Sequence, residues 1–233
     1  MEKIKPKISV IAVNWYASDF AKLLVNSVKS NCKNIDDIEI ILIDNSGELD
    51  IDGVKIVKSP RNLGHGYGLD TAVALADSEY ILILDIDAHI LLKDWDTKLV
   101  EELEKTKSSM ICAQGNEIKP IRPLFMFFKK ETVNGMSFKS LQFEGINFDV
   151  VIPLYFRVLT KYGHKSVLML PYRKTDYKDV FGNEYSFNGE RIVYHNWYGT
   201  RWFGKGGVIE HKVIDNREYE DFKIKKENLF KQL

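Results

Sequence analysis

Two aspartates, Asp85 and Asp87, stand one residue apart directly after an unbroken apolar run, Ile81–Leu84. Such a run is typical of a strand that is covered on both faces. An unpaired buried carboxylate is very costly, so two of them at this place indicate a positive partner. On an extended segment their side chains point the same way, and two convergent carboxylates suit Mg²⁺ or Mn²⁺. We interpret them as ligands of a divalent cation; the alternative is one turn cap and one solvated acid.

Polar residues also follow the preceding strand-like runs. Asn14 comes after the first run and Asp44 after the second, where it can accept a hydrogen bond from a ligand or cap a turn. Segment 59–70, SPRNLGHGYGLD, follows the third run and supplies Asn62 and Asp70 as ligand-binding candidates. Its glycines permit close backbone approach at a helix start, where a phosphate or sugar can bind.

The elements that must position these residues alternate between strand and helix. Apolar runs and one-sided apolar patterns predict strands at 8–13, 38–43, 54–59, 81–84 and 110–114, and helices at 18–30, 66–78 and 94–107. Ser18 is expected to cap the first helix, and the small residues of the second allow close packing on a sheet. This order implies a mostly parallel sheet with helices on both faces, whose strands bind ligands at their carboxyl ends.

The second half has a different pattern. Segment 120–138 is aromatic and contains Pro and Gly, which indicates antiparallel strands. A helix is predicted over 149–163, with Pro153 in its first turn and Gly163 after its end. Further strands are predicted at 164–170 and 191–195, and a terminal helix at 217–233.

Composition excludes several classes of protein. Lys and Arg number 33, as do Asp and Glu, so the formal net charge is zero and a basic field for nucleic acid is absent. No apolar run approaches a membrane span and no signal-peptide pattern precedes the first strand, which predicts a cytoplasmic protein with peripheral membrane contact left open. Cys32 and Cys112 lack metal-ligand spacing and are expected to be reduced thiols. Thr71 stands where a dinucleotide-binding fingerprint would have its last glycine, so the pattern argues against a nicotinamide-binding site.

Three segments in order, ISVIAVNWY, IILIDNSGELD and RNLGHGYGLDTAVALADSEYILILDID, resemble the family 2 glycosyltransferases of the GT-A fold. The likeness covers residues 8–107 and implies an α/β fold with a mostly parallel central sheet, helices on both faces and a smaller mixed acceptor-side region. It implies transfer of a sugar from a nucleotide-sugar donor, with Mn²⁺ or Mg²⁺ as cofactor and inversion at the anomeric carbon. The residues it assigns to the donor are Asn14, Asp44 (at the base), Asn62, Asp70 and Asp85 (at the ribose or metal), and it assigns Asp87 to the metal.

The acceptor side also resembles the family. In EGINFDVVIPLYFRVLTKYGHK an acid, an arginine and G-x-K resemble the family's acceptor-side helix, which makes Asp149 the first candidate for the catalytic base. The family often has a Glu-Asp pair there, so Glu144 is the second candidate. His195 resembles a late histidine that some members use on the metal or diphosphate. Arg201 and Trp202 are candidates for a loop that closes over the donor.

We therefore predict a single domain over residues 1–233, with a nucleotide-sugar-binding half (1–115) and an acceptor-binding half (116–233) that ends in the terminal helix. The acceptor is expected to be a saccharide, a lipid-linked molecule or a protein. Phe125, Phe127 and Phe128 are expected in the core, with contact to the acceptor as the alternative.

Two rival functions fit parts of the pattern. Aspartate-based phosphohydrolases also end an apolar strand in D-x-D, but usually place Gly directly after the second acid and Thr or Val one residue later. Here those positions are Ala88 and His89. The other rival is a nucleotide-sugar binding module that has lost its base. Sugar release on addition of an acceptor separates a transferase from a binder, and phosphate release without an acceptor indicates the hydrolase.

Overall fold

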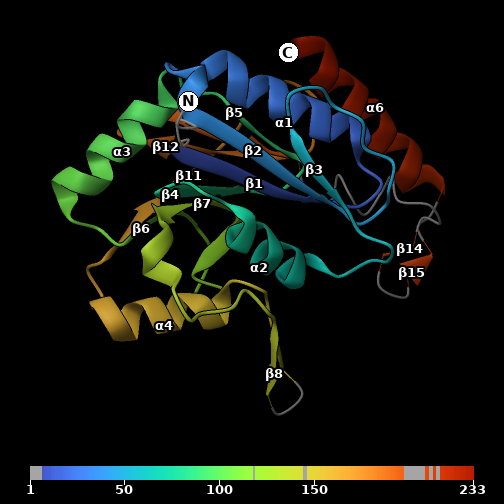
Figure 1. Ribbon diagram of the computed structural model, residues 1–233. Coiled ribbons are helices and arrows are strands. Elements are labelled where there is room, and N and C mark those ends of the chain that lie inside the picture. Colours follow the sequence, from blue (N-terminus) through green and yellow to red (C-terminus); the bar gives the residue numbers. More distant parts are fainter. Residues whose placement is uncertain (1–6, 118, 144–145, 197–207, 210–211, 214–215) are drawn as a thin grey trace.

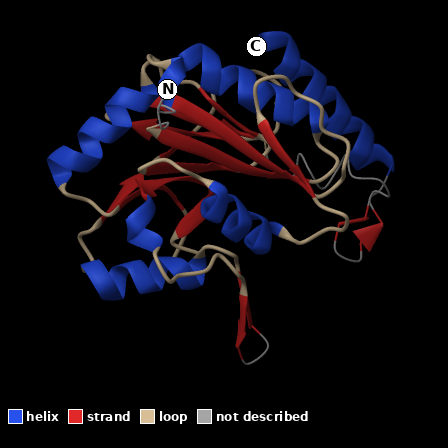
Figure 2. Cartoon of the chain, in the orientation of Figure 1, coloured by secondary structure: helices blue, strands red, loops and turns tan. Residues whose placement is uncertain are grey.

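A sheet of seven strands lies at the centre of the structure, a computed structural model that describes residues 7–117, 119–143, 146–196, 208–209, 212–213 and 216–233 (Figures 1 and 2). The strands lie in the order β10-β6-β7-β4-β1-β2-β3, and of these seven only β7 runs antiparallel to its neighbours. Their bounds are β1 (Ile8–Asn14), β2 (Ile38–Asp44), β3 (Lys55–Lys58), β4 (Tyr80–Leu84), β6 (Met110–Gln114), β7 (Ile121–Lys129) and β10 (Val167–Leu170). The prediction of a mostly parallel sheet is confirmed.

Helices cover both faces of this sheet (Figure 1). One face carries α1 (Ser18–Asn31), α3 (Trp95–Thr106) and α6 (Asn216–Gln232), and the other carries α2 (His65–Leu75) and α4 (Ile152–Tyr162). Pro153 lies in the first turn of α4 and Gly163 follows its last residue, as predicted. Among the described residues, every helix is too short or too polar to cross a membrane.

Alternation along the central strands divides the apolar side chains between two cores. Leu82 and Leu84 of β4 pack under the face that carries α1 and α3, whereas Ile81 and Ile83 pack under the face that carries α2 and α4. This two-sided burial explains why the run in front of Asp85 is unbroken. Each such side chain contributes about 1.5–3 kcal/mol when it is fully buried. The aromatic residues Phe125, Phe127 and Phe128 of β7 are also fully buried, which confirms the expectation that they belong to the core.

A smaller antiparallel sheet lies beside the first, in the order β11-β12-β13-β5. Its strands are β5 (Ala88–Ile90), β11 (Tyr172–Arg173), β12 (Asn183–Phe187) and β13 (Glu190–His195). Glu184 of β12 is fully buried and accepts two hydrogen bonds from Arg191 of β13, at 2.7 and 2.6 Å. This sheet connects the two halves of the chain, because β5 directly follows Asp87 and pairs with β13 of the second half.

Short elements complete the described chain. These are the 3₁₀ helices η1 (Ile35–Asp37) and η2 (Lys130–Val133) and the hairpins β8 (Leu141–Phe143) with β9 (Ile146–Phe148) and β14 (Val208–Ile209) with β15 (Lys212–Val213). The β8–β9 hairpin projects from the lower edge of the molecule in Figure 1.

The expected cap of the first helix is wrong. Helix α1 has Ala17, not Ser18, at its N-cap position, and Ser18 is the first helical residue. The Ala17 N–H instead donates to the side-chain oxygen of Asn14, at 3.2 Å. Asn14, the last residue of β1, therefore hydrogen-bonds to the start of α1 and fixes it at the sheet edge where ligands are expected.

Candidate functional site

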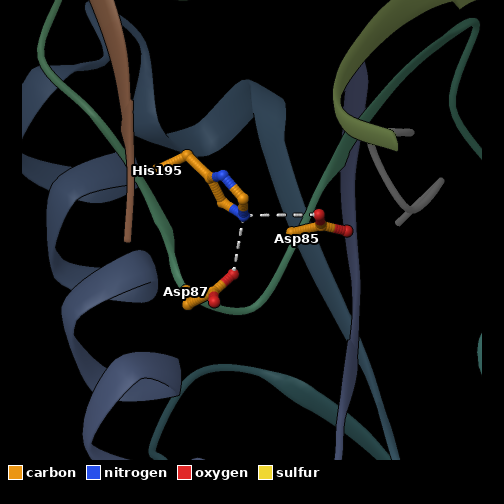
Figure 3. Close-up of side chains that lie close together, drawn as sticks. All are labelled: Asp85, Asp87 and His195. Carbon is orange, nitrogen blue, oxygen red and sulfur yellow. Dashed lines mark ion pairs between the residues drawn. The ribbon is translucent and has the colours of Figure 1, made fainter. Parts of the chain in front are cut away.

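Asp85 and Asp87 converge because the chain turns sharply after β4. The Ala88 N–H donates to the Asp85 carbonyl oxygen at 2.9 Å, which closes a tight turn before β5 begins. The extended geometry expected from the sequence is therefore wrong for this segment. The two carboxylates nevertheless face one point, since both lie near the same nitrogen of His195 (Figure 3).

His195 reaches the aspartates through strand pairing. It is the last residue of β13 and lies opposite Ala88 of β5, while the next residue, Asn196, donates its N–H to the Asp87 carbonyl at 3.0 Å. Its Nε2 lies 3.2 Å from Asp87 Oδ1 and 3.6 Å from Asp85 Oδ2 (Figure 3). Two aspartates separated by a single residue and a histidine more than a hundred positions away thus form one cluster.

Burial and oppositely charged neighbours act in opposite directions on the pKa values of Asp85 and His195. Burial raises the pKa of Asp85, helped by the charges of Asp87 and Asp149, although His65 and His195 oppose the effect. Burial alone lowers the pKa of His195, but the charge of Asp87 and a hydrogen bond to it outweigh burial, so this pKa is raised. The distances of 3.2 and 3.6 Å let a protonated imidazole pair with both carboxylates. A cation that replaced the proton would satisfy both carboxylates at once.

The donor set fits Mn²⁺ or Mg²⁺. Asp85, Asp87 and His195 each offer one ligand atom, and the three atoms lie within 4.8 Å of one another. Hard divalent ions favour carboxylate oxygen, and Mn²⁺ also accepts imidazole nitrogen. The other ring nitrogen of His195, Nδ1, is buried and has no hydrogen-bond partner among the described residues. The metal-ligand pairing predicted for Asp87 and His195 is therefore compatible with the geometry, and Asp85 joins the same cluster.

A cavity of about 880 Å³ opens over the cluster. This volume lies in the range of small-molecule sites. Residues near the ends of β1 and β2 and at the start of α2 line one side, namely Val13, Trp15, Asn45, Asn62, Gly64 and His65. Residues of β6, β7 and the turn between them line the other side together with Asp149, namely Gln114, Gly115, Lys119, Arg122, Pro123 and Leu124. The smaller sheet contributes Tyr172, Asn183 and Tyr185. The acidic strand β4 lies between β1 and β7, so the cavity has one side on each flank of the cluster.

Asn14 and Asp44 lie beneath this cavity rather than in its wall. Both are fully buried, and the Asn14 amide donates to Asp44 Oδ1 at 2.9 Å. The same oxygen accepts the N–H and the hydroxyl of Ser46, and Oδ2 accepts the Leu49 N–H at 2.8 Å. Burial acts to raise the pKa of Asp44, but these hydrogen bonds outweigh burial and lower the pKa. Asp44 therefore organises the loop after β2.

The segment after β3 brings different residues to the cavity from those that were expected. Asn62 lines the cavity and accepts the Gly64 N–H at 2.8 Å, as the chain enters α2. His65 begins α2, and its Nε2 lies 3.6 Å from Asp85 Oδ1. Asp70 instead accepts the Ser137 hydroxyl at 2.6 Å and the Phe138 N–H at 2.8 Å, and it is not among the cavity-lining residues.

The glycines of this segment serve packing. A Cβ atom on Gly66 would lie 2.5 Å from the Phe138 carbonyl oxygen, and one on Gly68 would lie 2.8 Å from the side chain of Val13. The expected close packing of this helix on the sheet is present. Close approach to a phosphate is not what requires Gly66 and Gly68, because protein atoms occupy the space beside both.

Asp149 lines the cavity on the β7 side. It precedes α4 by two residues that are not helical, so it does not open the helix as was expected. One oxygen, Oδ1, accepts the Val150 N–H at 2.8 Å, and Oδ2 lies 3.6 Å from Lys119 Nζ. The second base candidate, Glu144, and the loop candidates Arg201 and Trp202 lie outside the described residues.

A family model, Glycosyl transferase family 2, matches residues 9–153, which is more than half of the chain. The chain belongs to glycosyl transferase family 2. The match includes both aspartates of the cluster and Asp149, and stops before the strands that supply Tyr185 and His195. A comparison with curated protein sequences finds no match.

Solved structures of glycosyltransferases share the fold of this family 2 member. The mannosyltransferase PcManGT from Pyrobaculum calidifontis, in complex with GDP-Man and Mn²⁺, has 15% identity and a TM-score of 0.54, and the match covers 72% of this chain and 56% of that one. Glucosyl-3-phosphoglycerate synthase from Mycobacterium tuberculosis, in complex with Mn²⁺, UDP and glucosyl-3-phosphoglycerate, has 13% identity and a TM-score of 0.53, with 71% and 70% covered. TarS from S. aureus with UDP-GlcNAc has 15% identity and a TM-score of 0.51, with 73% and 60% covered. The chain thus spans little more than half the length of two of these proteins.

Several cavity residues of this family 2 member were missed from the sequence. His65, Lys119, Arg122 and Tyr185 line the cavity, and none of them was a candidate. A signal existed for His65 alone, because it stands within the glycine-rich helix start that was already expected to bind a ligand. Arg122 and Tyr185 reach the cavity on antiparallel strands, and Lys119 lies in the turn between β6 and β7. The pairing of these strands cannot be read from local spacing.

Proposed function

We propose that this protein is a metal-dependent, inverting glycosyltransferase that moves a sugar from a nucleoside-diphosphate sugar to a hydroxyl group. One observation carries the proposal: Asp85, Asp87 and His195 form a cation-compatible cluster at the centre of a cavity that has Asp149 on one flank and the start of α2 on the other. Membership of the family favours a glycosyltransferase over a phosphohydrolase. The carboxylate of Asp149 at the cavity favours an enzyme over a binding module that has lost its base.

The nucleotide is proposed to lie over β1 and β2. Ligands of open α/β sheets bind outside the carboxyl ends of the strands, and Trp15, Asn45 and Asn62 line the cavity there. The first turn of α2 begins at His65 on the cavity edge, and the unpaired backbone N–H groups of a helix start favour a phosphate. Asn14 and Asp44 are proposed to hold this floor in place from below, rather than to meet the base.

The diphosphate is proposed to meet the acidic cluster. Asp85, Asp87 and His195 would hold Mn²⁺ or Mg²⁺, which when bound offsets the charge that develops on the leaving nucleoside diphosphate. Pairing of β13 with β5 fixes the imidazole against both carboxylates, so the three ligand atoms need little rearrangement.

Asp149 is proposed as the general base. Its Oδ2 faces Lys119, while Oδ1 is held by the Val150 N–H, so the carboxylate is kept in one orientation at the cavity edge. The base takes the proton of the acceptor hydroxyl as that oxygen attacks the anomeric carbon. Attack from the face opposite the leaving diphosphate inverts the configuration. Glu144 stays the second candidate.

The two cysteines bear on the cellular context. Cys32 and Cys112 are both free, as is usual for proteins in a reducing compartment, so we propose a cytoplasmic enzyme. The acceptor is proposed to be a saccharide, a lipid-linked molecule or a protein that approaches from the Asp149 side, with peripheral membrane contact as an open option.

Turnover with a donor panel tests the proposal. The purified protein with Mn²⁺ would be given UDP-glucose, UDP-GlcNAc and GDP-mannose, with and without a mixture of simple glycosides, and nucleoside diphosphate and inorganic phosphate would be followed separately. We expect nucleoside diphosphate release that rises when an acceptor is added. Release of inorganic phosphate without an acceptor would instead support the hydrolase, and tight donor binding without any release would support the binding module.

A further inference from the structure

The described residues supply no partner for one cation of the cavity, Arg122. It stands near the start of β7, lines the cavity and is partly buried. Among the described residues it has no ion pair or side-chain hydrogen bond, whereas the neighbouring cavity cation, Lys119, lies 3.6 Å from Asp149. A guanidinium group carries five N–H donors and is always charged, so a ligand that enters the cavity meets an available cation here.

A bulge in β7 brings this side chain to the cavity. Along β6, the neighbours Cys112 and Ala113 pair with Met126 and Arg122 of β7, so three residues of β7 have no counterpart on β6. Bulges re-aim side chains and are frequent beside active sites. The start of β7 therefore departs from regular pairing at the place where Arg122 meets the cavity.

The formal charges of the cavity leave Arg122 uncompensated. Asp85 and Asp87 together carry −2, which a divalent cation would neutralise, and Lys119 neutralises Asp149. Arg122 then remains as +1. The diphosphate of a donor is one candidate for this charge, and a group on the other substrate is the second.

Strand order favours the other substrate. Arg122 lies on β7, which is separated from the nucleotide side by β4, because the sheet runs β7-β4-β1-β2 (Figure 1). Neighbouring strands lie about 4.8 Å apart, so β1 and β7 are about 10 Å apart. On the nucleotide side, His65 and the start of α2 already offer an anion site.

An aromatic pair adjoins the unpaired cation. Tyr172 and Tyr185 line the same cavity as Arg122, with ring centroids 6.2 Å apart, and Tyr172 is 54% exposed. Tyr185 and Arg122 both line the cavity, and the charge of Arg122 opposes the rise that burial causes in the pKa of Tyr185. An exposed ring beside a cation suits a ligand with one apolar face and one anionic group.

We propose that Arg122 binds a carboxylate or phosphate group on the acceptor, so that the enzyme selects an anionic acceptor. The proposal rests on the proposed function. Asp149 would act on a hydroxyl of this acceptor, while Arg122 holds the anion on the same side of the cluster.

Matched probe pairs test the proposal. The protein loaded with Mn²⁺ and UDP, or with GDP if UDP does not bind, would be titrated with methyl glucuronide against methyl glucoside and with glycerol phosphate against glycerol. We expect at least one anionic probe to bind about 10- to 100-fold more tightly than its neutral counterpart, since hydrogen bonds to charged groups have that strength. Arg122→Gln should remove the preference and Arg122→Lys should keep part of it. Arg157→Gln, which changes an exposed arginine of α4, should leave it intact.

The failures of the two proposals differ. Absence of any nucleoside diphosphate binding with Mn²⁺ in the wild type would contradict the proposed function. If the nucleotide binds but no anionic probe is preferred, or the preference survives Arg122→Gln, the anionic acceptor is excluded. A tenfold loss of nucleotide affinity in folded Arg122→Gln would assign the arginine to the diphosphate. A preference found only between UDP-glucuronate and UDP-glucose would assign it to the donor sugar.

Discussion

The buried carboxylate of Asp44 gives the sharpest test of how the nucleotide side is built. It accepts four hydrogen bonds, three at Oδ1 and one at Oδ2 from the Leu49 N–H. In Asp44→Asn, one amide NH₂ must replace an accepting oxygen. If it replaces Oδ2, one charge-assisted hydrogen bond is lost and the Leu49 N–H is left buried against another donor, which we expect to cost about 2–4 kcal/mol of unfolding free energy.

The assay is denaturant unfolding of Asp44→Asn beside the wild type, with Asp50→Asn as control. Asp50 is exposed in the same loop region, so its substitution should change stability by less than about 0.5 kcal/mol. The pKa of Asp44 is lowered in the folded state, so its contribution is complete above the unfolded pKa of about 3.9 and is lost as pH falls through the folded pKa. The stability gap between the two proteins should therefore be full at neutral pH and close in acid.

Nucleotide affinity decides between the two roles of Asp44. If the carboxylate only organises the loop, folded Asp44→Asn should bind nucleoside diphosphate with little change. Unaltered stability together with a loss of about 10- to 100-fold in affinity would refute the reasoning and place Asp44 at the base.

Two further outcomes are expected. Asp149→Asn should lower the rate of sugar transfer in single-turnover kinetics by about 10²- to 10⁴-fold, with donor affinity retained. Glu144→Gln should have a smaller effect on this rate, and the reverse order would assign the base to Glu144. Gly68→Ala should destabilise the fold by about 1–3 kcal/mol, because its Cβ would lie 2.8 Å from Val13, and Val13→Ala in the same protein should restore part of that loss in thermal unfolding. Equal stability of Gly68→Ala and wild type would mean that the helix can shift on the sheet.

The sequence predicted the sheet well because its signal is local. The runs that became β1, β2 and β4 are apolar on both faces, and the helices between them carry one-sided patterns, so strand, helix and order follow from spacing alone. Pro153 and Gly163 bounded α4 for equally local reasons.

The candidate site was predictable only in part. Asp85 and Asp87 follow a recognisable run, but their convergence comes from a turn that the alternation rule does not describe. His195 came from the family resemblance, and only the pairing of β13 with β5 explains its position. Arg122 depends on a bulge in β7, and bulges leave no simple periodic trace in sequence.

The dependence of nucleotide binding on the acidic cluster tests the central claim most directly. Calorimetric titration of UDP and GDP would be run on the wild type with Mn²⁺ and with excess EDTA, and with Mn²⁺ on Asp87→Asn, His195→Gln and the exposed control Asp50→Asn. We predict binding by the wild type and the control with Mn²⁺, and a loss of tenfold or more in EDTA and in both cluster variants. EDTA removes the ion, and each variant replaces a strong ligand atom with a weaker neutral amide. Equal affinity with Mn²⁺ and with EDTA, or full affinity in Asp87→Asn, would contradict a metal-held diphosphate.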